Sequence, residues 1–122
     1  MVVSRGTDPA GGVRVVLVTA PDMGCARALA RALVGEAVAA CVSLLPGMVS
    51  IYRWKGAVHE AQEVLLLVKT RSERLGELER IVAREHPYEV PEVVALEPAA
   101  VAQRYLDWLL AECSAAGDDP PP

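Results

Sequence analysis

The segment from Glu85 to Glu92 contains the residues of this chain that are best suited to binding a cation. Its sequence, EHPYEVPE, combines a histidine, a tyrosine, three glutamates and two prolines. Each proline fixes its own φ and favours extended geometry in the residue before it, so the segment is predicted to be a stiff connection. Imidazole and carboxylate groups are common ligands of transition metals. We therefore predict His86, Glu89 and Glu92 as candidate metal ligands.

Extended geometry limits how these ligands can cooperate. In a straight strand His86 and Glu92 point to the same side, but six residues at ~3.3 Å each place them roughly 20 Å apart. A single ion cannot contact both from a straight segment. Either the chain bends between them, or a further ligand comes from another element or another subunit.

A structural role for the same residues is equally open. His86 can end the preceding helix, while Pro87 and Pro91 set the path into the next strand. The Tyr88 hydroxyl can satisfy a buried polar partner. The residue types alone do not choose between a ligand site and a rigid connector.

Composition limits the class of protein. A chain of 122 residues is expected to form one domain. It is 52% apolar but has no Phe, so its core must be built from Val, Leu and Ala. This apolar content is high for a small domain and predicts an oligomer, because large exposed apolar patches usually mark interfaces.

Charge and motif content argue against several functions. The net charge of −4 and the interleaving of Arg with Glu do not provide the basic surface that nucleic-acid binding needs. No apolar run is long enough to span a bilayer. With two histidines, no nucleophile–base signature and no glycine-rich phosphate loop, the chain is predicted not to be an enzyme.

Cysteine usage indicates the compartment. The three cysteines are odd in number and widely spaced, which predicts neither a disulfide framework nor a zinc site. Together with the lack of a secretory signal, this predicts a cytoplasmic protein.

The hydrophobic patterns alternate between strand and helix between two tails. Residues 1–12 and 114–122 are predicted to be disordered, and residues 13–113 to form one domain. The first predicted elements are a strand at 13–19, a helix capped by Asp22, a strand at 40–52 that is interrupted at Pro46 and Gly47, and a hairpin tip at 54–56. They are followed by a central strand at 64–70, a helix that is capped by Ser72 and ends near Glu85, a strand at 90–96 and a helix opened by Pro98. This β-α-β-β-α-β order with an additional C-terminal helix predicts an α+β ferredoxin-like sandwich, with helices on one face of an antiparallel sheet.

Six segments in this order resemble one family. They are VTAPD (18–22), AACV (39–42), SIYRWKG (50–56), EVLLLVKT (63–70), HPYEVPE (86–92) and YLDW (105–108). Together they resemble the CutA family of divalent-ion (copper) tolerance proteins, over residues 13–112.

The resemblance implies a ferredoxin-like subunit in a tight homotrimer, in which extended hairpins of neighbouring subunits pair. It also implies a role in tolerance of copper and other divalent metals, with a divalent cation such as Cu or Zn as the candidate ligand and no established catalysis. Tyr52, Trp54, Tyr88 and Trp108 become candidates for trimer packing or for lining clefts between subunits. The alternative implied function is a non-catalytic trimeric scaffold or signalling-type sensor that binds a small molecule or partner protein in those clefts.

Two departures from relatives bear on the metal. Some relatives suspected of binding copper have a cysteine where this chain has Val18, and some have a second histidine where it has Glu85. The softest ligand, the cysteine thiolate, is thus missing, which argues against copper in particular, and a single histidine argues against tight binding of a soft metal. A weaker carboxylate-rich site for a harder cation is the open alternative.

Overall fold

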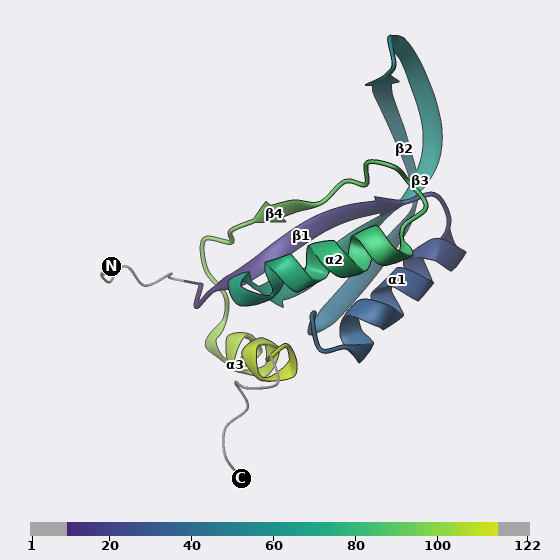
Figure 1. The fold of residues 1–122 in the computed structure, drawn as a ribbon. Helices are drawn as coiled ribbons and strands as arrows, with labels where there is room; N and C mark the ends of the chain where they lie inside the picture. Colours follow the sequence, from purple (N-terminus) through teal and green to yellow (C-terminus); the bar gives the residue numbers. More distant parts are fainter. Residues whose placement is uncertain (1–9, 115–122) are drawn as a thin grey trace.

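The computed structural model describes residues 10–114, which form a four-stranded antiparallel sheet and three α-helices (Figure 1). In chain order the elements are β1 (Val13–Ala20), α1 (Met23–Gly35), β2 (Cys41–Trp54), β3 (Ala57–Arg71), the 3-10 turn η1 (Ser72–Arg74), α2 (Leu75–Glu85), β4 (Val94–Leu96) and α3 (Gln103–Glu112). The strands lie in the order β2-β3-β1-β4. This confirms the predicted α+β ferredoxin-like fold with an additional C-terminal helix. None of the helices between residues 10 and 114 is long and apolar enough to cross a membrane.

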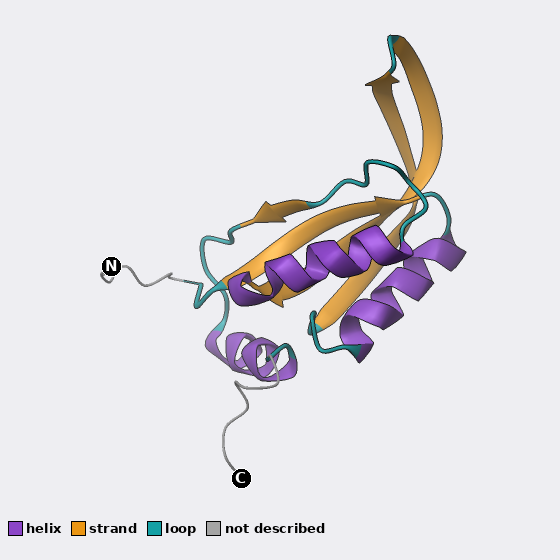
Figure 2. Cartoon of the chain, viewed as in Figure 1, coloured by secondary structure: helices purple, strands orange, loops and turns teal. Residues whose placement is uncertain are grey.

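The main core lies between the sheet and the helices α1 and α2, which cover one face side by side (Figure 2). β3 is central, as predicted, because it pairs with β2 on one side and β1 on the other. Its residues alternate between the two faces of the sheet, so Leu66 and Val68 point into this core. They pack with Leu29 and Leu33 of α1 and with Leu78 of α2. Burial of this apolar face holds the two helices to the sheet.

The opposite face of the sheet is apolar and only partly covered. Leu17, Leu65 and Leu67 are half-buried there, while Val94 and Leu96 on β4 are exposed. α3 covers only one end of this face, where Leu109 and Cys113 pack on Val13 and Ala40. A wide apolar surface therefore remains open in the single subunit.

The β2–β3 hairpin extends well beyond the body of the domain (Figure 1). The register between these strands shifts between Leu45 and Met48, where Gly47 has φ +83°. This confirms the predicted interruption at Pro46 and Gly47. At the tip, Lys55 and Gly56 both have positive φ, as a two-residue hairpin turn of the primed type requires.

Other boundaries confirm or correct the predictions. Asp22 caps α1 as expected, because its Oδ1 accepts a hydrogen bond from the Cys25 N–H at 2.8 Å. The predicted Ser72 cap is wrong: the Ser72 hydroxyl donates to Glu73, and the helix begins as a 3-10 turn. β4 is shorter than the predicted 90–96 strand, since Pro91 has no N–H to donate to a ladder.

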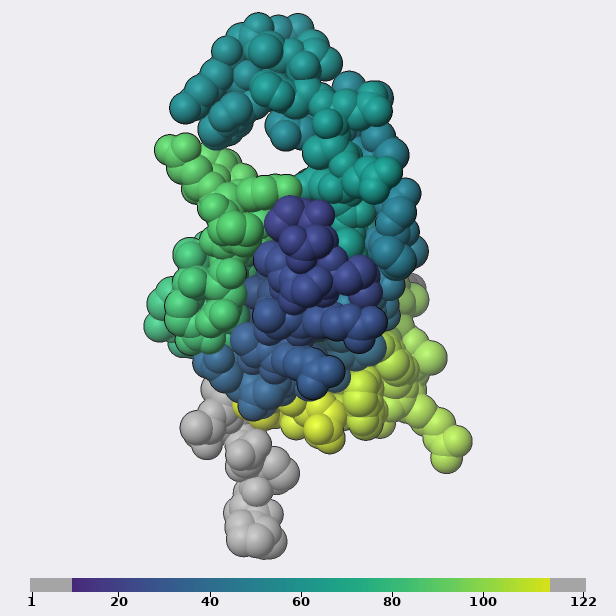
Figure 3. Space-filling model, turned by 90° about the vertical axis from the view of Figure 1, so that its right-hand side faces the viewer, coloured from purple at the N-terminus to yellow at the C-terminus, as the bar shows by residue number. Residues whose placement is uncertain are grey.

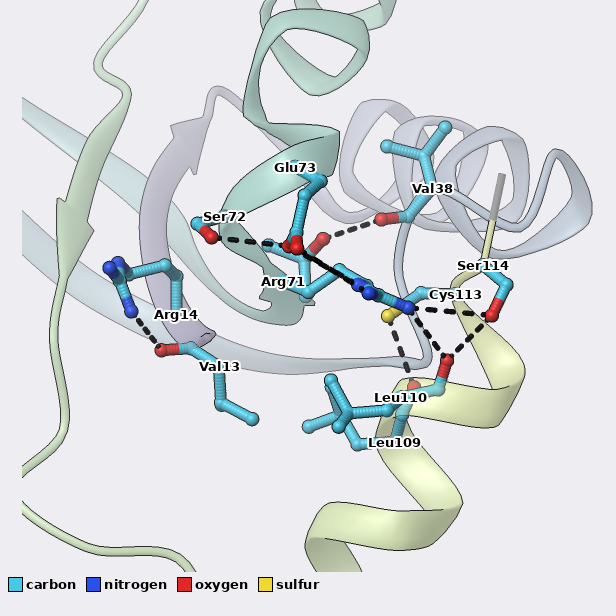
Figure 4. Close-up of polar contacts among 11 residues, drawn as sticks. Val13, Arg14, Val38, Arg71, Ser72, Glu73, Leu109, Leu110, Cys113 and Ser114 are labelled. Carbon is cyan, nitrogen blue, oxygen red and sulfur yellow. Dashed lines mark hydrogen bonds and ion pairs between the residues drawn. The ribbon is translucent and has the colours of Figure 1, made fainter. Parts of the chain in front are cut away.

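The final helix also differs from its prediction. α3 begins at Gln103 and not at Pro98, because the preceding Ala102 is extended, with ψ 135°. Arg71 fixes the end of α3, since its Nη1 donates to the Leu110 carbonyl at 3.4 Å and to the Ser114 hydroxyl at 3.5 Å (Figure 4).

The predicted tails are described only in part. Residues 10–12, which belong to the predicted disordered N-terminus, form a turn, and Ala10 is buried against α3. Residues 1–9 and 115–122 lie outside the described residues, so disorder there stays a prediction.

Candidate functional site

His86 is turned into the protein, where its side chain connects the 86–92 segment to β1. It is 8% exposed, and its Nε2 lies 2.6 Å from the carbonyl oxygen of Thr19. The backbone N–H of Tyr88 donates to Nδ1 at 3.1 Å. A carbonyl oxygen can only accept, so Nε2 is the donor in the contact with Thr19, and Nδ1 is the acceptor in the contact with Tyr88. Both ring nitrogens are thus used in holding the chain in place.

Tyr88 links the same segment to β3 through a carboxylate. Its hydroxyl donates to Oε2 of Glu63 at 3.0 Å, and Glu63 is 8% exposed. Burial and this hydrogen bond raise the pKa of Tyr88 to about 12. The phenol therefore remains a donor to the carboxylate across the neutral pH range. The Tyr88 ring also contacts the His86 ring, with 4.7 Å between centroids.

A cavity of about 660 Å³ lies between the hairpin and the 87–92 segment. The hairpin arches over this hollow in Figure 3. Glu63 and Thr19 lie at the sheet, and the segment after α2 provides the other wall. The lining residues are Thr19, Ser50, Ile51, Tyr52, Trp54, Glu63, Pro87, Tyr88, Glu89, Val90 and Glu92. The site therefore combines three carboxylates with three aromatic side chains.

The predicted metal ligands are only partly brought together. Glu89 and Glu92 are exposed and both line the cavity, whereas His86 is not a lining residue and its Nε2 is hydrogen-bonded to the Thr19 carbonyl oxygen. Within residues 10–114 no group of three His, Cys, Asp or Glu side chains is placed to hold a metal ion. The prediction that His86, Glu89 and Glu92 bind a metal thus stays a prediction.

The predicted aromatic residues divide between two places. Tyr52, Trp54 and Tyr88 line the cavity, while Trp108 lies on α3 and contacts Tyr105, with 5.5 Å between ring centroids. Glu63 lines the cavity as well, although it was not among the predicted site residues. Its only signal was its position directly before the apolar run of β3, where a charged side chain needs a partner to become buried.

Comparison with known proteins identifies the family. The model of the CutA1 divalent ion tolerance protein family matches residues 14–112, nearly all of the described chain. The chain belongs to the CutA1 family. This confirms the resemblance of the six sequence segments.

The CutA1 relatives include bacterial and plant proteins. The chain is 54% identical over 95 residues to the "Divalent-cation tolerance protein CutA" of Thermus thermophilus, with 78% of this chain and 92% of the relative covered. It is 43% identical over 95 residues to "Protein CutA, chloroplastic" of Arabidopsis thaliana, where it spans 78% of its own length but only 52% of the relative's.

A solved CutA1 structure has the same fold. The divalent cation tolerance protein of Thermus thermophilus superposes with a TM-score of 0.78 at 52% identity, over 80% of this chain and 94% of the other. The α+β architecture described above is therefore the architecture of this family.

Proposed function

We propose that this chain forms a homotrimer that acts in divalent-metal-ion tolerance and binds metal cations weakly, with copper as the first candidate by family likeness. The observation that carries the metal proposal is the cavity, which Glu63, Glu89 and Glu92 line without any Lys, Arg or His. Carboxylate oxygens suit divalent cations, and an acidic cavity attracts them. The Thermus relative's name, a divalent-cation tolerance protein, supports the same role.

The trimer is supported by the open face of the sheet and by its edges. Leu17, Leu65 and Leu67 form an apolar centre there, which continues to the exposed Val94 and Leu96. β2 is an edge strand of 14 residues, so its outer backbone groups can pair with a strand of a neighbouring subunit. Association of subunits would cover the open apolar face and pair the edge of β2. The second contact is the predicted pairing of hairpins between neighbouring subunits.

Assembly and metal binding are linked in this proposal. Since one subunit offers no group of three ligands within residues 10–114, a neighbouring subunit would complete the coordination of a cation at Glu89 or Glu92. His86 can coordinate a metal ion only if it gives up its hydrogen bond to the Thr19 carbonyl or its hydrogen bond from the Tyr88 N–H. We therefore assign the first contact with the metal to the two exposed glutamates.

Calorimetric titration tests the metal proposal. Cu(II), Zn(II) and Mg(II) are titrated into wild type, into the double variant Glu89→Gln/Glu92→Gln, and into Glu79→Gln as a matched control on the exposed face of α2. We expect the double variant to lose most of its Cu(II) and Zn(II) binding, and the control to keep it. Identical isotherms for all three proteins would overturn the metal proposal.

Light scattering tests the trimer. We expect a mass about three times that of the 13.0 kDa chain. Leu67→Glu places a charge in the centre of the open face and is expected to give monomers, while Val34→Glu, an exposed position on α1, keeps the trimer. A monomeric wild type would contradict the proposed assembly.

The second candidate is a non-catalytic trimeric scaffold or sensor that binds a small molecule or partner protein between subunits. The cavity favours this candidate, because Tyr52, Trp54 and Tyr88 provide aromatic walls that a metal ion does not need. In both candidates the protein works by binding, and we assign it no catalytic step. We also propose a cytoplasmic location, which the free thiols of Cys25, Cys41 and Cys113 suit.

A further inference from the structure

The cavity under the hairpin has a chemical character that a bare metal ion does not explain. Its volume of about 660 Å³ is in the range of sites for small organic ligands. Three aromatic rings and the aliphatic side chains of Ile51 and Val90 line it together with the three carboxylates. A ligand that fills it must therefore offer both apolar surface and positive charge.

Glu63 provides a fixed point for that charge. It is 8% exposed, yet only its Oε2 has a hydrogen-bond partner within the described chain, the Tyr88 hydroxyl. Its Oε1 is unpaired within the described chain but is not fully buried, and Glu63 is one of the residues that line the cavity. A carboxylate that is largely removed from water gains most from a charged donor at its free oxygen.

The aromatic walls are suited to the same charge. Trp54 already has a cation near it, since Lys55 Nζ lies 5.8 Å from its ring centroid. Tyr52 and Tyr88 also line the cavity, and each ring presents a negative face to a cation. The Tyr88 hydroxyl donates to Oε2 of Glu63 at 3.0 Å and so orients this carboxylate.

We propose that this cavity binds an organic ammonium ion with a short apolar chain. The ammonium group donates to Oε1 of Glu63, and the chain lies against Tyr52 and Trp54. A second amine at the other end of the chain would meet Glu89 or Glu92 at the rim. All of these groups belong to one subunit, so this site does not depend on the proposed metal function. It rests on the second candidate function, small-molecule binding, and names the class of ligand.

Three ligands of equal chain length and different charge test the charge requirement. 1,4-Diaminobutane, neutral 1,4-butanediol and anionic succinate are titrated calorimetrically into the full chain in the presence of a chelator. We expect the diamine to bind at least about tenfold more tightly than the other two, the difference that one charge-assisted hydrogen bond provides. Equal affinities for the diamine and the diol would overturn the proposal.

Variants locate the site. Glu63→Gln is expected to weaken diamine binding about tenfold or more, and Trp54→Leu severalfold, whereas Glu79→Gln on α2 leaves it unchanged. Thermal unfolding checks that Glu63→Gln is folded, and Trp54→Leu, an exposed position, provides the test if it is not. Wild-type affinity in both cavity variants would refute the site.

The two proposals fail separately. Diamine binding without Cu(II) binding supports the ammonium site and refutes the metal function. Cu(II) binding without diamine binding supports the metal function and refutes the ammonium site.

Discussion

His86 reaches the carbonyl oxygen of Thr19, 67 positions earlier in the chain, and donates to it from Nε2 over 2.6 Å. Its Nδ1 accepts from the Tyr88 N–H, so one imidazole joins the end of β1 to the start of the 87–92 segment. This pair of hydrogen bonds positions the wall of the cavity that carries Glu89 and Glu92.

Removal of this imidazole should destabilise the fold. His86→Ala leaves a buried carbonyl and a backbone N–H without their partners, and we expect a loss of about 2 kcal/mol in the free energy of unfolding. Chemical denaturation measures it. His59→Ala, an exposed histidine on β3, serves as control and should change stability by less than about 0.5 kcal/mol. Equal losses in the two variants would show that the Thr19 contact has no energetic role.

Tyr88 should lose its phenolic proton at a higher pH than an ordinary tyrosine does. The pKa of Tyr88 is raised to about 12 by burial and by its hydrogen bond to Glu63, so wild type should show a phenolate step near pH 12 that Tyr88→Phe lacks. The unfolded chain ionises this phenol first, at its ordinary value of 10.0. The stabilisation is therefore complete below pH ~10 and is lost as the pH rises to about 12. Ultraviolet titration and pH-dependent denaturation measure both effects, and a phenolate step that is unchanged in Tyr88→Phe would contradict the assignment.

The bulge in β2 should depend on glycine. Gly47 has φ +83°, a conformation that side chains disfavour, so Gly47→Ala should destabilise the protein by about 1 kcal/mol. Gly35 at the end of α1 has open space around it and no positive φ. Gly35→Ala should therefore be neutral or stabilising. Thermal unfolding compares the two, and the reverse order would disprove the requirement for glycine at the bulge.

The C-terminal helix should be anchored by one leucine. Leu109 is fully buried against Val13 and Ala40, and Leu109→Ala should cost about 2–5 kcal/mol by leaving a cavity. Glu112→Ala, exposed on the same helix, is the matched control and should stay within about 0.5 kcal/mol. Denaturation followed by tryptophan fluorescence in a Trp54→Leu background, where Trp108 is the remaining tryptophan, reports on α3. A wild-type transition in Leu109→Ala would mean that α3 does not depend on this contact.

Much of the fold could be read from local patterns. The alternation of strand and helix periods predicted the ferredoxin-like order, and the central position of β3 followed from its apolar residues on both faces. Asp22, Gly47 and the turn at Lys55 and Gly56 were found because capping, positive φ and tight turns each demand particular residue types. Boundaries that depend on packing, such as the starts of β4 and α3, were misplaced.

The family and the order of the elements could be predicted from the amino-acid sequence, because both depend on residue type and spacing along the chain. The directions of the side chains in the 86–92 segment could not be predicted, because they depend on how distant parts of the chain pack together. The tertiary structure turned His86 toward Thr19, joined Tyr88 to Glu63 and left Glu89 and Glu92 at the cavity. Contacts between residues far apart in sequence form only when the sheet and helices pack, and no local pattern encodes them.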